Sequence, residues 1–341
     1  MKLFVFWATW DLFRRKVLES LQKLKKEDLQ IVAIGRKSFT DEVYQNFICD
    51  DRCEVWFKKN ISYKEIEFDE NTIYDCCKLN LEKDNINYFY ASLPPQWFSS
   101  VIEVLWRFKQ EWYAVQLLIE KPFWDSLEHA QYLKDMLIQT SLISNTYLVD
   151  HYLFKEEILK LQAMDFSSFE IGATETLGLE NRAGYYEGIW ALKDMVQSHF
   201  INILAKVFPI DEATIQNMTI KSYIRGQYNS YSEELWKESP TDTFVSLELL
   251  IYDKRICFIT WKALDHKRTW ITIDDETIEL SSKNNEYEHI FTSFFANKTK
   301  DFPTIEQAIL ARKMIYKINT HPSKLISYVK GSSLDKVTSL Q

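Results

Sequence analysis

The pattern of hydrophobic and polar positions divides the first half of the chain into alternating strands and helices. Short apolar runs predict buried strands at residues 1–6, 29–35, 86–95, 114–123 and 145–153. Amphipathic stretches predict helices over residues 11–27, 99–112 and 125–142, the last one capped by Asp125 or Ser126. Strands separated by helices of this length are typical of an α/β fold with a doubly wound parallel sheet, which we expect over residues 1–151.

The second half has a different pattern, in which strands and helices no longer alternate. The sequence predicts helices over residues 186–208, 288–298 and 304–319, and strands at 244–252 and 256–261. This order favours an α+β domain with a largely antiparallel sheet over residues 152–341. No repeat, low-complexity segment or Pro/Gly-rich linker marks the boundary, so the change of topology alone places it near residue 152.

Composition and charge narrow the class of protein. A chain of 341 residues with 46% hydrophobic and 26% charged residues is typical of a soluble globular protein of two domains. The net charge of −8 argues against a general binder of nucleic acid or membrane surfaces. No apolar stretch is long enough to span a bilayer, and Asp11 ends the N-terminal apolar run too early for a signal peptide. Five irregularly spaced cysteines predict reduced thiols in the cytoplasm, and their spacing does not suit zinc.

Charged residues lie at the ends of several predicted strands. Asp11, Arg36, Lys121 and Asp150 all lie at such strand ends, where doubly wound sheets bind their ligands. Arg36 stands where NAD-dependent Rossmann proteins place an acidic residue against the ribose 2′-hydroxyl, whereas an arginine accommodates the 2′-phosphate of NADP. Arg36 therefore favours NADP, and an ordinary loop arginine is the alternative.

Glycine is rare in this chain and tryptophan is common. There are 7 Gly and 11 Trp, whereas average usage would give roughly 24 glycines. The turn FWATWDL, between the first strand and the first helix, shows the consequence. A phosphate-binding turn at this place needs glycines for the tight bend and for close approach of its backbone to a pyrophosphate, but Trp7 and Trp10 occupy it.

Several segments, taken in order, resemble the glucose-6-phosphate dehydrogenase family over nearly the whole chain. The resemblance is carried by FYASLPP, EKPFWDS, VDHYLFKEE, ENRAGYYEGIWALKDMVQSHF, YIRGQY, SPTDTF, FITWKALDHK and YEHIFTSFFANKTKDFPTIEQA. One departure is large, because the stretch between ITIDDETIEL and YEHIF is much shorter than in the family. In the family this stretch contributes strands to dimerisation, so the resemblance leaves a homodimer open.

The resemblance implies an NADP-dependent oxidoreductase of glucose metabolism. Its reaction would oxidise D-glucose 6-phosphate at C1 to 6-phosphogluconolactone, the first step of the oxidative pentose phosphate pathway. His199 matches the family's catalytic base, and Asp150 matches the carboxylate that orients it. The matches to substrate-binding residues are Lys121, His151, Tyr152, Lys155, Glu175, Asp194, Lys262 and Lys267. Taken singly, a packed histidine, a turn aspartate and solvated lysines would be the commoner interpretations.

The family's cofactor motif, G-A-[ST]-G-D-L, matches the turn FWATWDL. The expected NADP site therefore contains Trp7, Ala8, Thr9, Trp10, Asp11 and Leu12, together with Arg36 and Lys121. Tryptophan also replaces a family glycine at Trp124, Trp190 and Trp261, whereas Phe154 at a sixth such position breaks the pattern.

Two interpretations of these tryptophans are open. In the first, the chain is a catalytically dead relative that serves as a binding or scaffolding protein. In the second, the gene encodes glycine with UGA, and the printed chain shows tryptophan at those codons. The second explains both the glycine deficit and the retained His199, Asp150 and Lys121. For the function, a dehydrogenase of a different phosphorylated or free hexose is a further alternative. We expect the fold to survive, with Trp7 and Trp10 partly exposed and poorly packed, whereas a structural tryptophan would be well buried.

Overall fold

The chain forms two compact units. The structure, a computed structural model, describes residues 1–124, 126–180, 186–187, 190–281 and 285–333. One unit consists of Met1–Phe154 and Lys283–Ile305, and the other of Lys155–Ser282 and Glu306–Gln341. The sequence suggested two uninterrupted domains, whereas residues 283–305 group with the first unit. Aromatic contacts explain this grouping, because Phe294 packs edge-on against Tyr88 and Tyr147.

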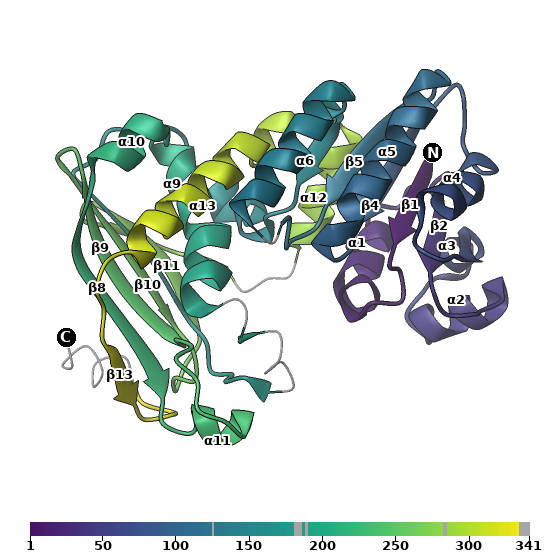
Figure 1. Ribbon diagram of the computed structural model, residues 1–341. Helices are drawn as coiled ribbons and strands as arrows, with labels where there is room; N and C mark the ends of the chain where they lie inside the picture. Colours follow the sequence, from purple (N-terminus) through teal and green to yellow (C-terminus); the bar gives the residue numbers. More distant parts are fainter. Residues whose placement is uncertain (125, 181–185, 188–189, 282–284, 334–341) are drawn as a thin grey trace. The chain divides into compact units, whose positions relative to one another are not determined.

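The first unit is built on a six-stranded parallel sheet with the strand order β3-β2-β1-β4-β5-β6 (Figure 1). This confirms the predicted doubly wound sheet, and the order is that of the Rossmann fold. Only β3 lacked a sequence signal, because it is a half-polar strand at the sheet edge. The strands are β1 (Lys2–Phe6), β2 (Gln30–Gly35), β3 (Ile61–Glu65), β4 (Ile86–Ala91), β5 (Ala114–Ile119) and β6 (Thr146–Leu148).

Helices cover the sheet of the first unit. The helices α4, α5 and α6 pack side by side, and α12 packs against α1 and η4. Ser126 Oγ accepts a hydrogen bond from the backbone N–H of His129 at 3.0 Å, which confirms the predicted cap at Ser126; Asp125 lies outside the described residues. The helices are η1 (Phe13–Val17), α1 (Leu18–Lys23), α2 (Asp41–Cys49), α3 (Val55–Lys59), α4 (Glu70–Lys78), η2 (Pro95–Trp97), α5 (Phe98–Gln110), α6 (Leu127–Gln139), η3 (Ile143–Asn145), η4 (His151–Phe154), α12 (Glu286–Phe295) and η7 (Thr299–Asp301).

The second unit is built on a seven-stranded mixed sheet with the order β12-β11-β7-β10-β9-β8-β13. The pairs β7–β10 and β8–β13 are parallel and the other neighbours are antiparallel, which confirms the predicted largely antiparallel sheet. The strands are β7 (Ser168–Thr174), β8 (Met218–Tyr228), β9 (Phe244–Ile251), β10 (Lys254–Trp261), β11 (Arg268–Ile273), β12 (Glu276–Glu279) and β13 (Leu325–Tyr328).

Helices complete the second unit, and one of them, Leu192–Phe200, packs against β10. The α13 helix is fixed to α10 by Lys317, whose Nζ donates to the backbone carbonyl of Ile215 at 2.6 Å. The helices are α7 (Glu156–Leu159), η6 (Leu192–Phe200), α9 (Ile201–Val207), α10 (Glu212–Asn217), α11 (Tyr231–Leu235) and α13 (Ile305–Asn319).

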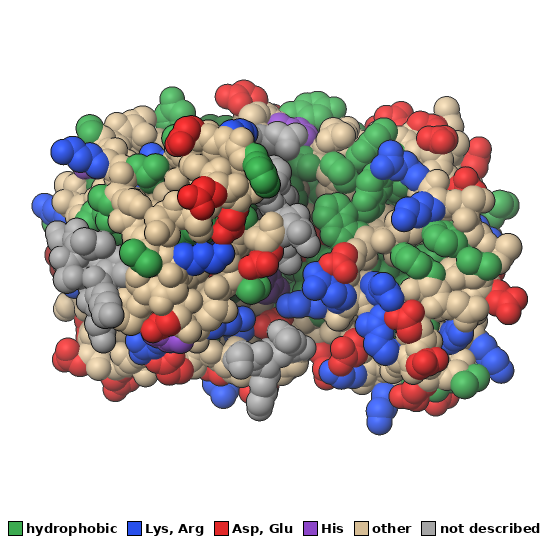
Figure 2. All heavy atoms as spheres, turned by 90° about the horizontal axis from the view of Figure 1, so that it is seen from below, with side chains coloured by type: hydrophobic (Ala, Val, Ile, Leu, Met, Phe, Trp, Pro, Cys, Tyr) green, Lys and Arg blue, Asp and Glu red, His purple; other side chains and the backbone are tan. Residues whose placement is uncertain are grey.

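Charged side chains of both signs mix on the surface. Figure 2 shows acidic and basic side chains interspersed over the face in view. Among the described residues, no helix combines the length and the apolar character needed to cross a membrane.

One cysteine prediction is wrong. Cys49 and Cys53 form a disulfide, with Cα atoms 5.2 Å apart. Cys49 is the last residue of α2, and Asp50 leaves the helix with φ of 47°, so the chain turns back and brings Cys53 within reach. Irregular spacing in the sequence gave no sign of this local turn. Cys76, Cys77 and Cys257 are free thiols.

Candidate functional site

The carboxyl edge of the parallel sheet brings the predicted residues of the first unit into one row. The register pairs Phe6 of β1 with Ala91 of β4, and Ala91 with Ile119 of β5. Ile119 in turn pairs with Leu148 of β6. Trp7, Lys121 and Asp150 come one or two residues after these strand ends, and Arg36 directly follows β2. This is the edge at which doubly wound sheets bind ligands, and the order reverses between β1 and β4.

The turn after β1 has a backbone conformation made for glycine. Trp7 has φ of 63°, in the left-handed region that a bulky side chain rarely occupies. The turn is closed by the Trp10 N–H, which donates to the Trp7 carbonyl at 3.0 Å. The Ala8 N–H donates to the carbonyl of Ile34 in β2, and the Ala8 carbonyl accepts the Tyr44 hydroxyl. Neighbouring elements therefore hold this turn in place with a tryptophan where the motif requires glycine.

The indole of Trp7 engages the arginine predicted to bind the 2′-phosphate. The Arg36 guanidinium carbon lies 4.5 Å from the centre of the Trp7 ring, and Phe68 packs against the same indole at 5.1 Å. Trp7 is half-buried and Trp10 is 46% exposed. Both are partly exposed, as predicted, but the expectation of poor packing is wrong for Trp7, because Phe68 and Arg36 both pack against its indole.

The other three tryptophans at family glycine positions behave differently from one another. Trp190 has φ of 61°, again in the left-handed region. Trp124 and Trp261 are buried, and Trp261 stacks on Phe244 with ring centres 3.7 Å apart. By the criterion of burial, Trp124 and Trp261 resemble structural tryptophans, whereas Trp7, Trp10 and Trp190 do not.

A buried carboxyl group, which the sequence did not single out, lies beside Lys121. Glu120 follows β5 directly and is 4% exposed. The hydroxyls of Tyr90, from β4, and Tyr287, from α12, both donate to Glu120 Oε2, at 3.0 and 3.1 Å. Burial raises the pKa of Glu120 from its usual value to about 7, although both phenols and Lys121 favour the carboxylate. The predicted strand at 114–123 contains both Glu120 and Lys121, and the residue pattern does not mark Glu120 as the buried one.

The raised pKa of Glu120 predicts a pH-dependent stability of the first unit. Folding favours the protonated acid, so its contribution is fully present below pH 4.5 and is lost as pH rises through about 7. Because of Glu120, the free energy of unfolding should fall by about 2 kcal/mol between pH 5 and pH 8. We expect this fall to be absent in Glu120→Gln. Urea unfolding at the two pH values measures this, with the exposed Glu42→Gln as control. An unchanged pH dependence in Glu120→Gln would contradict the raised pKa.

The DHY segment starts the short helix η4 after β6. Asp150 is 1% exposed, and its Oδ1 accepts the backbone N–H of Tyr152 at 3.1 Å. This hydrogen bond fixes one carboxylate oxygen toward its own turn, as in an Asx-turn. The rings of His151 and Tyr152 pack edge-on, with centres 5.1 Å apart.

In the second unit, three predicted substrate-binding residues converge. Lys262 follows β10 directly, and its Nζ forms a short ion pair with Glu175, which follows the parallel strand β7. The same Nζ lies 3.8 Å from Asp194 Oδ2 and 5.1 Å from the centre of the Tyr186 ring. A cation between two carboxylates offers the mixed polarity that recognises sugar hydroxyls. Tyr186 is a member of this cluster that the sequence did not predict.

His199 lies on the same helix as Asp194, and this helix is not an ordinary α-helix. The segment Leu192–Phe200 is a π-helix, in which hydrogen bonds join residues five apart. Asp194 and His199 are five apart, so this winding brings them nearer to one side than an α-helix would. His199 is buried. Periodicity predicted a helix here but not its winding.

A buried aspartate fixes the start of this π-helix. Asp242 accepts the backbone N–H of Ala191 at 2.7 Å through Oδ1 and the Arg225 Nε–H at 2.7 Å through Oδ2. Burial raises the pKa of Asp242, against the opposing influence of Arg225. Asp242 lies in the SPTDTF segment, whose family resemblance was the only sequence signal for it.

The remaining predicted residues do not form one cluster within either unit. Lys155 is half-buried, and its Nζ donates to the Ser281 carbonyl at 2.8 Å. Lys267 is exposed. Lys121, Asp150, His151 and Tyr152 belong to the first unit, while His199 and the other substrate-binding residues belong to the second. The hydrogen bond predicted between His199 and Asp150 therefore stays a prediction.

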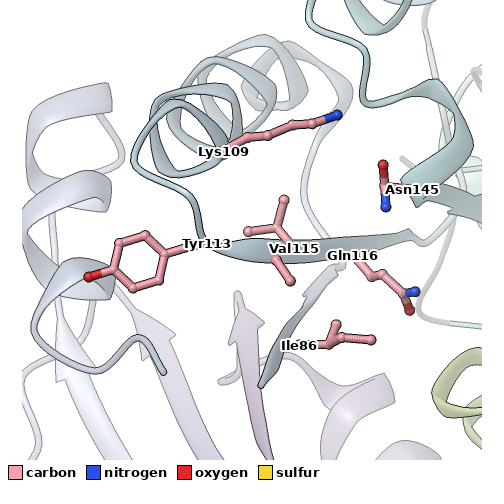
Figure 3. Close-up of a pocket in the computed structure, with 7 residues that line it drawn as sticks. Ile86, Lys109, Tyr113, Val115, Gln116 and Asn145 are labelled. Carbon is pink, nitrogen blue, oxygen red and sulfur yellow. The ribbon is translucent and has the colours of Figure 1, made fainter. Parts of the chain in front are cut away.

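A small pocket lies at the opposite edge of the parallel sheet, where β4 and β5 begin. It has a volume of about 140 Å³, and Figure 3 shows Lys109, Tyr113 and Asn145 around it. Lys109 Nζ donates to the Ser141 carbonyl at 2.6 Å, so this cation already has a partner. Because it lies at the amino ends of the strands, this pocket is separate from the carboxyl-edge residues.

The strand order and the mixed sheet define the class of protein, a Rossmann unit joined to an α+β unit. Two family models extend this assignment: "Glucose-6-phosphate dehydrogenase, NAD binding domain" matches residues 4–159, and "Glucose-6-phosphate dehydrogenase, C-terminal domain" matches residues 162–209. Together they cover more than half of the chain. The chain belongs to the glucose-6-phosphate dehydrogenase family.

Individual relatives agree with this membership. A glucose-6-phosphate 1-dehydrogenase from Chlamydia pneumoniae is 29% identical over 74% of this chain, which spans 64% of that relative's length. The crystal structure of glucose-6-phosphate 1-dehydrogenase from Mycobacterium avium has a TM-score of 0.80 at 20% identity, covering 97% of this chain and 94% of that one. A glucose-6-phosphate dehydrogenase in complex with glucose-6-phosphate has a TM-score of 0.77 at 18% identity, with the same coverage. These two structures share the fold of this chain.

Proposed function

We propose that this protein is an NADP-dependent glucose-6-phosphate dehydrogenase of the cytoplasm, acting at the entry of the oxidative pentose phosphate pathway. The observation that carries the proposal is the cluster in the second unit, in which the Lys262 ammonium lies between the carboxylates of Glu175 and Asp194. Asp194 is on the same helix as His199. A structurally similar glucose-6-phosphate dehydrogenase has a solved structure in complex with its substrate glucose-6-phosphate, and the family model names an NAD-binding domain.

The residues of this chain have distinct roles in the proposal. Lys155 and His151, with Tyr152, would bind the phosphate, while Glu175 and Asp194 would accept hydrogen bonds from ring hydroxyls. His199 would take the proton of the C1 hydroxyl, and Asp150 would stabilise the imidazolium that results. Lys121 would lie against the reacting oxygen and polarise it. Glu120, the chain neighbour of Lys121, is held in place by hydrogen bonds from Tyr90 and Tyr287.

The turn that should hold the dinucleotide does not fit it with the printed residues. The Trp7 indole and the left-handed backbone stand where a pyrophosphate needs open access to amides, and Arg36 is engaged by that indole. The proposed activity therefore belongs to the protein with glycine at residues 7 and 10. Sedimentation of the protein tests whether it forms a homodimer.

Formation of NADPH from NADP and glucose 6-phosphate, followed by absorbance, tests the function. Two proteins are compared: the printed sequence, and one with glycine at residues 7, 10, 124, 190 and 261. We expect turnover from the glycine form and little from the printed form. A folded glycine form that binds NADP and yet forms no NADPH would refute the proposal. Activity with unphosphorylated or other hexoses alone would favour the dehydrogenase of a different hexose.

A further inference from the structure

Tryptophan occupies backbone conformations that belong to glycine, and it does so beyond the family motifs. Among the described residues, twelve other than glycine have positive φ, and four of them are tryptophan: Trp7, Trp112, Trp190 and Trp236. Gly331 is the one described glycine with such a φ. Asparagine and aspartate are the usual exceptions at these angles, and a bulky side chain is an outlier. Trp112 and Trp236 belong to no sequence motif that pointed to function.

Trp112 ends helix α5 in the position that glycine takes in a Schellman motif. Its φ is 68°. The Trp112 N–H donates to the Lys109 carbonyl at 3.0 Å, and the Tyr113 N–H donates to the Phe108 carbonyl at 3.1 Å. This pair of hydrogen bonds defines the motif, whose left-handed residue is usually glycine because a Cβ atom is unfavourable there.

Trp236 repeats the arrangement at the end of α11, in the other unit. Its backbone has φ of 59° and ψ of 24°. The Trp236 N–H donates to the Glu233 carbonyl at 3.3 Å, and the Lys237 N–H donates to the Ser232 carbonyl at 3.2 Å. Two helices in two units thus end with the same hydrogen bonds and the same improbable residue.

The side chains at these two positions do not account for the choice of residue. Trp112 is 89% exposed and Trp236 is 93% exposed, whereas a tryptophan contributes to stability by being buried. An indole that anchors a partner protein is the competing explanation, since exposed tryptophans mark some interaction sites. That explanation does not account for the left-handed backbone at both positions.

The two positions also separate the interpretations of the motif tryptophans. Trp112 lies before β5, at the opposite edge of the sheet from the turn at Trp7. Loss of cofactor binding would relax selection on the cofactor turn, but helix ends elsewhere would still be selected for stability. A codon that the cells read as glycine would instead occur both in the cofactor turn and at helix ends elsewhere.

We infer that residues 112 and 236 are glycine in the protein as its own cells make it, encoded by UGA codons that those cells read as glycine. The same reading applies to residues 7, 10, 124, 190 and 261. This inference concerns the backbone at helix ends and does not depend on the proposed dehydrogenase activity.

The coding DNA and the protein purified from its source cells test the inference directly. We expect UGA at codons 112 and 236, and peptide masses that require glycine at both residues. UGG at either codon, or a peptide mass that requires tryptophan at either residue, overturns it. Since neither measurement uses enzymatic activity, an inactive enzyme would leave this result intact and would count only against the proposed function.

Thermal unfolding tests the structural half of the argument on recombinant protein. Trp112→Gly and Trp236→Gly should each raise Tm by roughly 2–4 °C, because each removes a Cβ from a left-handed residue. The matched control is Trp106→Gly, inside the same helix α5, which should lower Tm because glycine is unfavourable in a helix interior. A fall in Tm for both Trp112→Gly and Trp236→Gly would contradict the assignment of glycine positions.

Discussion

Replacing Trp7 and Trp10 together by glycine should increase the affinity for NADP by about two orders of magnitude or more. Two or three backbone amides at the start of the first helix would become accessible to the pyrophosphate. Hydrogen bonds to a charged group contribute about 1.5–3 kcal/mol each, so even two of them account for a hundredfold change in Kd. Isothermal titration calorimetry measures this without relying on tryptophan fluorescence, which the substitutions themselves alter.

The same substitution should increase the preference for NADP over NAD. In the printed chain, Arg36 lies over the Trp7 ring at 4.5 Å. Without the indole, its guanidinium is available to a 2′-phosphate, for which arginine is well suited. The control is Trp56→Gly, which removes a half-buried tryptophan of α3 from the same unit. Equal NADP affinities in the double variant, the control and the printed chain would mean that the turn does not bind the dinucleotide.

The sequence predicted the architecture well because buried strands and amphipathic helices have strong periodic signals. Every predicted strand of the parallel sheet has its counterpart, while the half-polar edge strand β3 had no such signal. Local chain reversal after Cys49 and the π-helical winding around His199 depend on individual backbone angles, which residue patterns do not record. The buried Glu120 was missed for a related reason, since its importance lies in tyrosines from β4 and α12 that are distant in sequence.

The tryptophans show where burial is a useful criterion and where it is not. Trp124 and Trp261 are buried, so their packing is compatible with either interpretation of the gene. Backbone angle discriminates better at Trp112 and Trp236, because their exposed side chains gain no burial that could offset the roughly 1–2 kcal/mol cost of a Cβ in the left-handed region. The left-handed conformation is shared by four tryptophans, Trp7, Trp112, Trp190 and Trp236. They lie in the cofactor turn, in the helix before His199 and at two ordinary helix ends. Glycine at all four positions explains the conformation in each place.

His199→Asn, made in the protein with glycine at the five motif positions, should lower kcat by 10²–10⁴-fold. Asparagine approximates the size of the buried imidazole but does not take a proton at neutral pH. The phosphate-binding residues are unchanged, so we expect the Kd for glucose 6-phosphate to change less than about threefold. Steady-state NADPH formation gives kcat, and calorimetry gives the Kd.

Lys155→Ala should have the opposite signature, and the contrast between the two variants is the decisive measurement. Removing one charge-assisted contact to a phosphate costs about 1.5–3 kcal/mol, so KM for glucose 6-phosphate should rise roughly 10–100-fold with kcat nearly unchanged. The exposed Lys324→Ala, in the same unit, is the control for loss of positive charge. Because Lys155 also donates to the Ser281 carbonyl, Tm of each variant is measured to separate binding from folding. Small and equal effects of His199→Asn and Lys155→Ala, in folded proteins, would show that neither residue has its assigned role.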